Sequence, residues 1–165
     1  MKSIQEKLLE LGIDIPERSA PAANYANYVI VGRLLFVSGK GPVGNARGKL
    51  GIDFTTEQGY QFARSTGIEV LAVLQEALGS LERVKQVVKV QGFINAGMEF
   101  TEHHKVLNGF SDLMVDVFAQ KGSHARSVLG AVSLRDNLPM VVDSIFEIYA
   151  EEGGKDDHEN GICYL

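Results

Sequence analysis

The stretch KGSHARSVLGAVSLRDNLPMVVDSIFEI, residues Lys121 to Ile148, contains two apolar runs that predict strands at about 125–132 and 140–149. One arginine, Arg126, stands at the start of the first run. A guanidinium is rarely buried without a partner, because it keeps its charge at every pH that proteins meet. The stretch itself offers these carboxylates as partners: Asp136, Asp143 and Glu147. Either one of them pairs with the arginine, or an anion from outside does.

Helices are predicted upstream of this stretch. A Ser-x-x-Glu spacing at Ser3 predicts a short amphipathic helix that ends at Gly12, and a Thr-x-x-Gln spacing at Thr55 predicts a long helix that ends at Gly79. A further helix is expected over about 101–119, because its apolar residues fall on one broad face.

Strands are predicted between these helices. YVIVGRLLFVSG predicts a hairpin of residues 27–31 and 34–38 around a tight turn, and the β-branched residues of RVKQVVKVQGFIN, residues 83–95, predict a largely buried strand. The glycine-rich segment 39–51 is expected to be a loop.

This order of elements predicts an α+β fold in which two main helices cover one face of a mixed β-sheet. The strands carry apolar residues on both faces, so the second face needs a cover, and we expect a homo-oligomer. The expected organisation is an N-terminal helix with its connector over 1–20, one main domain over 21–150 and a polar tail over 151–165.

Composition narrows the classes of function. The chain has 165 residues, 45% hydrophobic and 22% charged, which is ordinary for a globular protein. Its net charge of -5 and its scattered lysines and arginines argue against a nucleic-acid partner. No apolar segment approaches the length of a membrane span, and the N-terminal residues lack the apolar core of a signal peptide. A single cysteine, Cys163, leaves no disulfide framework, which fits a reducing cytoplasm.

The histidines are weak candidates for a site. His103 and His104 are neighbours in the first turn of the expected helix, where side chains diverge by about 100°, so surface exposure is favoured over a shared metal. His124 would share a strand face with Arg126, and a hydrogen-bonded structural role is favoured over a functional one. The sequence predicts neither a metal nor a cofactor.

Three further residues are singled out by type. Gly39 ends a strand abruptly and would let a backbone approach a ligand closely, although its segment lacks the P-loop spacing. Asn108 lies in a helix among apolar neighbours and needs a polar partner. Tyr25, judged by type alone, favours a packing role.

The segment HARSVLGAVSL, followed after a short loop by an apolar strand, resembles the signature of the YjgF/Rid family of imine and enamine deaminases, historically labelled endoribonuclease L-PSP. NYVIVGRLLFVSGKGPV resembles the first hairpin of that family, and VKQVVKVQGFINAGMEF resembles its central strand. The likeness runs from about Ala22 to Ile148, and the N-terminal helix resembles a longer-chain subgroup. The resemblance implies a chorismate-mutase-like fold and a homotrimer with ligand clefts between subunits.

The resemblance also implies roles for individual residues. The arginine that matches Arg126 holds the carboxylate of a short 2-imino acid, a ligand suited to the bidentate fork of a guanidinium. Residues matching Tyr25, Gly39 and Asn108 line the same cleft, and the backbone near Val128 would face the imine end.

The water-handling position departs from the family pattern. The family's glutamate falls on Val141, fifteen residues after Arg126, and valine cannot activate water. Asp143 would lie on the same strand face as Val141, about 6.6 Å further along at a rise of about 3.3 Å per residue. It is the candidate replacement for the family's glutamate. One hypothesis is therefore a deaminase of reactive imino acids, and the other is a binding or sensing protein for small carboxylates. A ribonuclease is disfavoured by the acidic charge.

Overall fold

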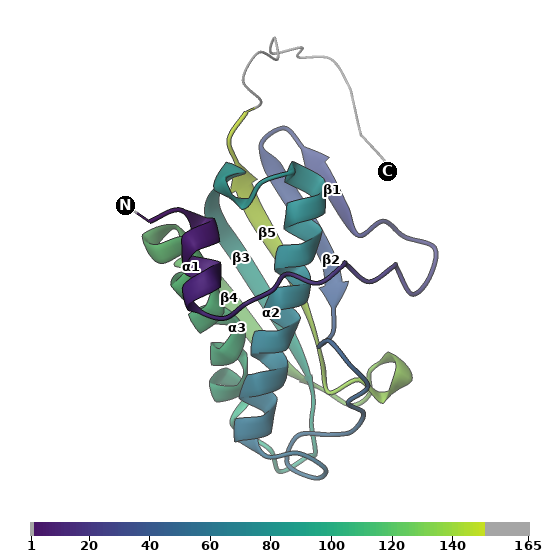
Figure 1. The fold of residues 1–165 in the computed structure, drawn as a ribbon. Coiled ribbons are helices and arrows are strands. Elements are labelled where there is room, and N and C mark those ends of the chain that lie inside the picture. Colours follow the sequence, from purple (N-terminus) through teal and green to yellow (C-terminus); the bar gives the residue numbers. More distant parts are fainter. Residues whose placement is uncertain (1, 151–165) are drawn as a thin grey trace.

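The computed structural model describes residues 2–150 (Figure 1), so the predicted tail over 151–165 lies outside the described part. The elements are α1 (Ile4–Glu10), β1 (Tyr28–Val31), β2 (Leu34–Lys40), α2 (Thr56–Leu78), β3 (Val84–Asn95), α3 (His103–Phe118), β4 (Ala125–Ala131) and β5 (Met140–Ile148). Short 3-10 turns are η1 (Leu81–Arg83), η2 (Ala119–Gly122) and η3 (Arg135–Asn137). Each helix and strand predicted within this part is present, with ends that differ by a few residues.

Local signals place the helix ends. Ser3 Oγ accepts a hydrogen bond from the Glu6 amide at 3.2 Å, and both bonds of the predicted capping box are present. Thr55 caps α2 in the same way, with its Oγ1 accepting from the Gln58 amide at 3.2 Å. Gly79 ends α2 in the left-handed region, with a φ of 71°, as its position predicts.

The predicted boundary between strand and loop at Gly39 is wrong by two residues. β2 continues through Gly39 and Lys40, because its pairing with β5 resumes after an irregularity: Val37 pairs with Ser144, and Lys40 pairs with Val142. Glycine composition alone could not show this, since the pairing partner lies about a hundred residues away in sequence.

The sheet has five strands in the order β1-β2-β5-β3-β4. β3 and β4 are parallel and are connected through α3, whereas the other neighbouring pairs are antiparallel. β4 and β5 follow one another in the chain but lie on either side of β3. The mixed sheet confirms the predicted α+β fold, and it leaves β1 and β4 as the edge strands.

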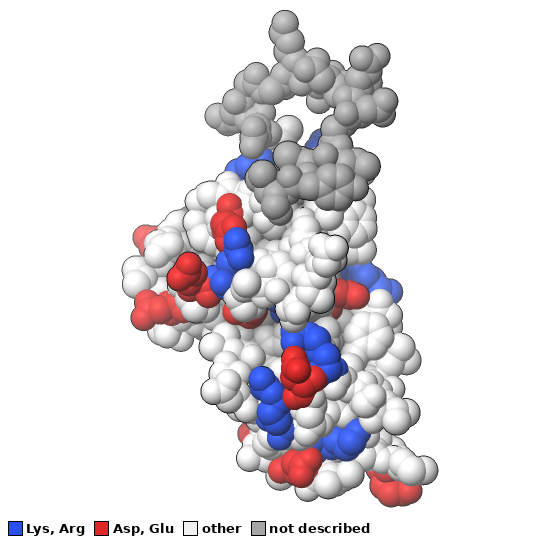
Figure 2. Space-filling view, turned by 90° about the vertical axis from the view of Figure 1, so that its right-hand side faces the viewer, with Lys and Arg blue, Asp and Glu red and all other residues white. Residues whose placement is uncertain are grey.

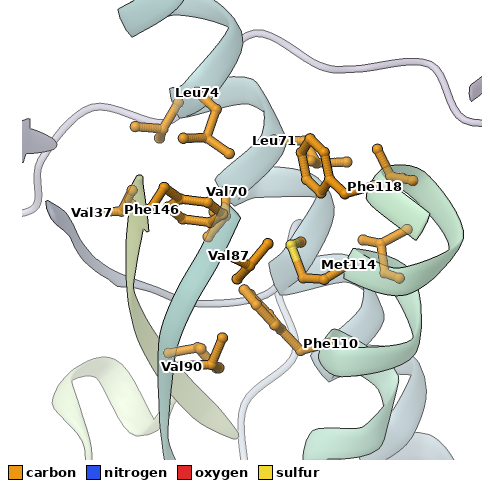
Figure 3. Packing of buried hydrophobic residues seen from close by; sticks show 14 of the residues in the cluster. Val37, Val70, Leu71, Leu74, Val87, Val90, Phe110, Met114, Phe118 and Phe146 are labelled. Atoms are coloured by element: carbon orange, nitrogen blue, oxygen red, sulfur yellow. The ribbon is translucent and has the colours of Figure 1, made fainter. Parts of the chain in front are cut away.

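Helices α2 and α3 cover one face of this sheet (Figure 1). Between the two layers, Phe146 of β5 lies beside Val70 of α2, and Val87 of β3 lies close to Phe110 of α3 (Figure 3). All four side chains are fully buried. The two helices approach closely at Gly109, where an added Cβ would lie 2.0 Å from the Tyr60 carbonyl oxygen.

The opposite face of the sheet carries no helix (Figure 1). Side chains that alternate with core residues along the strands point to this open face. They include these exposed apolar residues: Val31, Leu34, Phe36 and Leu129. The single chain therefore leaves several apolar side chains exposed on the side away from its helices.

Candidate functional site

Arg126 lies on the edge strand β4 and points toward α3. It pairs with Val90, which is buried beneath the helices, so both residues face the helical layer. Arg126 Nη1 donates to Ser111 Oγ at 2.9 Å, and its Nη2 donates to Asn108 Oδ1 at 2.9 Å and to the His104 carbonyl oxygen at 3.0 Å. The three acceptors recur at helical spacing along one side of α3, so the three bonds hold the guanidinium against this side of the helix.

None of the carboxylates in the same stretch pairs with this arginine. Asp136 pairs with Arg135 at 3.0 Å, Glu147 pairs with Lys85 at 2.7 Å, and Asp143 lies on the other face of the sheet. Within residues 2–150, the partners of Arg126 are neutral oxygens. Its positive charge therefore has no carboxylate against it in this part of the chain.

His124 and Ser111 form a hydrogen-bonded pair beside Arg126. His124 Nδ1 lies 2.6 Å from the Gly122 carbonyl oxygen, and its Nε2 lies 3.0 Å from Ser111 Oγ. A carbonyl oxygen only accepts, so Nδ1 carries the proton and Nε2 accepts from the serine hydroxyl. Burial lowers the pKa of His124, and the nearby charge of Arg126 acts in the same direction, against the hydrogen bond to Gly122.

Ser111 was not among the residues that the sequence singled out. The signal that could have found it is its position three residues after Asn108, which puts both side chains on one face of α3. His124 is hydrogen-bonded, as its predicted place beside Arg126 suggested.

A second group of predicted site residues lines a cavity of about 600 Å³ on the open face of the sheet. Tyr25, Gly39 and Asp143 border this cavity, together with Phe36, Lys89, Gln91 and other neighbours. Burial raises the pKa of the Asp143 carboxyl, and the charge of Lys89 partly opposes that effect. The cavity therefore holds a half-buried carboxyl that keeps its proton at higher pH than an ordinary aspartate.

Val141 occupies the position expected for the family's glutamate and lies directly against Gly39. A Cβ added to Gly39 would lie only 2.5 Å from Val141 Cγ1, so glycine is needed there. Asp143 follows two residues later on the same face of β5, as predicted from the strand period.

The predicted site residues fall into two groups within one chain. Arg126, Asn108 and Val128 lie at the edge strand, on the side of the helical layer. Tyr25 and Asp143 line the cavity on the open face, across β3 from β4. A single subunit therefore does not bring these two groups into one cleft.

A buried polar cluster holds the connector that carries Tyr25. Lys40 Nζ donates to Asn27 Oδ1 at 2.5 Å and to the Ser19 carbonyl oxygen at 3.2 Å, and the Ser19 amide donates to Glu69 Oε1 at 2.6 Å. Burial lowers the pKa of Lys40, and the carboxylate of Glu69 opposes this effect. These bonds tie the connector to β2 and α2.

His103 and His104 have separate surroundings. His103 is the first residue of α3, and its ring lies edge-on to Phe100 with centroids 5.1 Å apart. His104 is exposed, and its carbonyl oxygen accepts from Arg126. Within residues 2–150, no three His, Cys, Asp or Glu residues lie so that they could hold a metal ion. Among the same residues, none of the helices has the length and apolar character needed to span a bilayer.

The chain is similar along most of its length to a known family and to a known protein. Residues 5–153 match the model of a family described as "YjgF/chorismate mutase-like, putative endoribonuclease". Protein TCP17 of Trypanosoma cruzi is 40% identical over 150 residues, which covers 88% of this chain and 94% of that protein.

Two crystal structures are similar along most of the chain. A protein of Shewanella oneidensis, described as a "putative endoribonuclease", has a TM-score of 0.86 and 32% identity, and the match covers 89% of this chain and all of that one. Protein Atu1372 of Agrobacterium tumefaciens, whose function is unknown, has a TM-score of 0.82 and 35% identity over 88% of this chain and 92% of that one.

Proposed function

Because the chain belongs to the YjgF/chorismate-mutase-like family, we propose that it hydrolyses reactive 2-imino or enamine acids to 2-oxo acids and ammonia, in a cleft between subunits of a homotrimer. The observation that carries this proposal is the charge of Arg126, which only neutral oxygens contact among residues 2–150. An anionic ligand would supply the missing countercharge.

The geometry of Arg126 suits a carboxylate. A guanidinium has five N–H donors in a planar fork, and the bonds to α3 use three of them. The remaining donors are Nε–H and one N–H of Nη1, which lie on different sides of the fork. Each can donate a hydrogen bond to an anionic ligand while the bonds to α3 keep the fork in place.

Two subunits together would complete the cleft. One subunit presents Arg126 and Asn108 beside its edge strand, and the next presents Tyr25, Gly39 and Asp143 around the cavity on its open face. The exposed apolar side chains of that open face favour association with another copy. Closed cyclic assembly of identical subunits would form three equivalent clefts in a trimer.

Asp143 is the residue in this cleft that can handle water. Hydrolysis needs a water oxygen to bond to the C=N carbon and a proton to reach the nitrogen, after which ammonia leaves and the carbonyl forms. Because its pKa is raised, the Asp143 carboxylate is a stronger base than an ordinary aspartate, and it can take a proton from water and return it to nitrogen. The backbone near Val128 would face the imine end of the ligand.

Val141 favours a second function, which is non-catalytic binding of 2-oxo acids. Its side chain fills the space beside Gly39 where the family's glutamate is expected, and it can neither hold nor activate water. In this alternative, the protein keeps the Arg126 anchor and binds a small carboxylate without turning it over.

Ribonuclease activity, which the description of the family names, has less support. The net charge is -5, and on the face in Figure 2 the lysines and arginines are interspersed with aspartates and glutamates. Binding a phosphate backbone usually needs a gathered basic surface.

The test is an imine-trapping assay. A threonine dehydratase generates 2-iminobutanoate, semicarbazide traps the imine that remains, and the trapped amount is measured with and without this protein. The hydrolase predicts less trapped imine with the wild type, no such effect with Arg126→Ala, and a normal effect with Arg135→Ala, an exposed control. If even high protein concentrations leave the trapped amount unchanged, the chain is no imine hydrolase. Binding of 2-oxobutanoate by such an inactive protein would support the second function.

A further inference from the structure

We propose that Ser111 is a nucleophile activated by His124, and that this pair accepts the acyl group of short carboxylic esters. The pair lies entirely within one chain, where Ser111 Oγ is 3.0 Å from His124 Nε2. This activity goes beyond imine hydrolysis, because it needs neither the cavity around Asp143 nor a second subunit.

His124 is held in the form that a general base requires. The Gly122 carbonyl oxygen, 2.6 Å from Nδ1, fixes the proton on Nδ1 and leaves the lone pair of Nε2 facing the serine hydroxyl. Burial and the charge of Arg126 both lower the pKa of the imidazole, so the neutral form that accepts a proton dominates at neutral pH. A neutral carbonyl here takes the orienting place that a carboxylate holds in many serine hydrolases.

Arg126 favours ionisation of the serine. Its Nη1 donates to Ser111 Oγ at 2.9 Å, so a positive charge lies against the oxygen that becomes negative as its proton leaves. The hydroxyl donates to His124 and accepts from Arg126, which leaves one lone pair of Oγ for attack on a carbonyl carbon. Both side chains of the pair are half-buried, and they lie beside the edge strand β4.

A donor for the developing oxyanion lies one helical turn away. Asn108 is exposed, and its Oδ1 accepts from Arg126 Nη2 at 2.9 Å, which fixes the orientation of the amide. The Asn108 amide nitrogen makes no hydrogen bond to any of residues 2–150, so it remains available as a donor. Together with the unused N–H groups of Arg126, it can stabilise a negative oxygen beside Ser111.

The reaction balances with water as its only co-reactant. Ser111 Oγ bonds to the ester carbonyl carbon while its proton moves to His124 Nε2, and the tetrahedral oxyanion then collapses. The bond to the leaving oxygen breaks, Nε2 returns the proton to that oxygen, and an acyl-serine remains. Water attacks this ester in the same way, so the acid is released and the serine hydroxyl is restored.

The experiment uses the full chain and 4-nitrophenyl acetate as the probe. After an acid quench, peptide mass mapping locates the acetyl group, and absorbance follows nitrophenolate release. We expect acetylation of Ser111 in the wild type, and none at this position in Ser111→Ala. His124→Gln, which keeps a hydrogen-bonding side chain but removes the base, should acetylate Ser111 at least about a hundredfold more slowly. Ser123→Ala, which removes an exposed neighbouring hydroxyl, should behave as the wild type.

Two results would overturn the proposal. The first is that the wild-type protein carries no acetyl group on Ser111 and releases nitrophenolate at a rate that does not depend on Ser111. The second is that Ser111 is acetylated at the wild-type rate in His124→Gln, while the thermal unfolding midpoint of this variant stays near that of the wild type. Both results concern a covalent product at one serine. This proposal can therefore fail while imine hydrolysis is confirmed, and it can hold while imine hydrolysis fails.

Discussion

Arg126 and Asp143 face opposite sides of the same sheet. Arg126 pairs with Val90 on β3 and bonds to the helix above it, whereas Asp143 pairs with the next residue, Gln91, and borders the cavity on the open face. Successive residues on a strand point to opposite faces, so one chain cannot direct both side chains at one small ligand. The proposed anchor and the proposed water-handling carboxyl can meet only across two subunits.

The Arg126 anchor makes a prediction about affinity. Arg126→Ala should weaken binding of 2-oxobutanoate by about 10- to 100-fold, because hydrogen bonds to charged groups contribute about 1.5–3 kcal/mol. Isothermal titration calorimetry measures this change. Arg135→Ala removes an exposed arginine that pairs with its neighbour Asp136, and it should bind as the wild type does. Equal affinity of Arg126→Ala and the wild type would refute the anchor under both proposed functions.

Asp143 predicts a dependence of stability on pH. Its folded pKa is raised by burial, so between the unfolded and the folded pKa the native state binds more protons than the unfolded state. The contribution of Asp143 to the free energy of unfolding therefore falls as pH rises through that window. Asp143→Asn lacks this loss, so its stability relative to the wild type should increase with pH across the window. Urea unfolding at a series of pH values tests this, and a difference that stays constant or decreases with pH would contradict it.

The contact between Gly39 and Val141 predicts a compensating pair of substitutions. Gly39→Ala places a Cβ 2.5 Å from a methyl of a stiff β-branched side chain, so it should cost about 1–3 kcal/mol of unfolding free energy. Val141→Ala in the same chain removes that methyl and should recover most of the loss. A double-mutant cycle by urea unfolding measures the coupling. Additive effects of the two substitutions would show that the contact is not responsible.

The buried Lys40 cluster predicts that its loss will release the connector. Lys40→Met leaves Asn27 Oδ1 without its donor and removes one of the two donors to the Ser19 carbonyl oxygen, so it should cost about 1–3 kcal/mol and expose residues 17–27 to protease. Lys105→Met, which breaks only an exposed pair with Glu102, should cost about 0–1 kcal/mol. Urea unfolding and limited proteolysis followed by mass mapping give the two readouts. Wild-type protease resistance in Lys40→Met would contradict the role of the cluster.

Local signals in the sequence were sufficient for most elements of the fold. The cap residues Ser3 and Thr55 and the stop at Gly79 predicted helix ends correctly, because capping depends on residues within one turn. The continuation of β2 through Gly39 and Lys40 depends on pairing with β5, a distant segment, and could not be predicted in the same way.

The surroundings of Arg126 also depend on segments that are distant in the sequence, so local signals could not predict them. The sequence indicated that its charge needs a partner, and it offered carboxylates from the same stretch. The oxygens that contact Arg126 come instead from α3, including Ser111 and Asn108, because parallel pairing of β4 with β3 sets which face the arginine occupies. That register follows from long-range packing, so a nearby stretch of sequence does not reveal it.

The composite cleft is tested most directly by mixing two inactive variants. Arg126→Ala and Asp143→Asn, each assembled alone, should lose imine hydrolysis in the trapping assay. Trimers assembled from equal amounts of the two chains should regain about a quarter of the wild-type activity, since random cyclic assembly gives that share of clefts an intact Arg126 and an intact Asp143. Mixed trimers that stay as inactive as either variant alone would contradict a cleft built from two subunits.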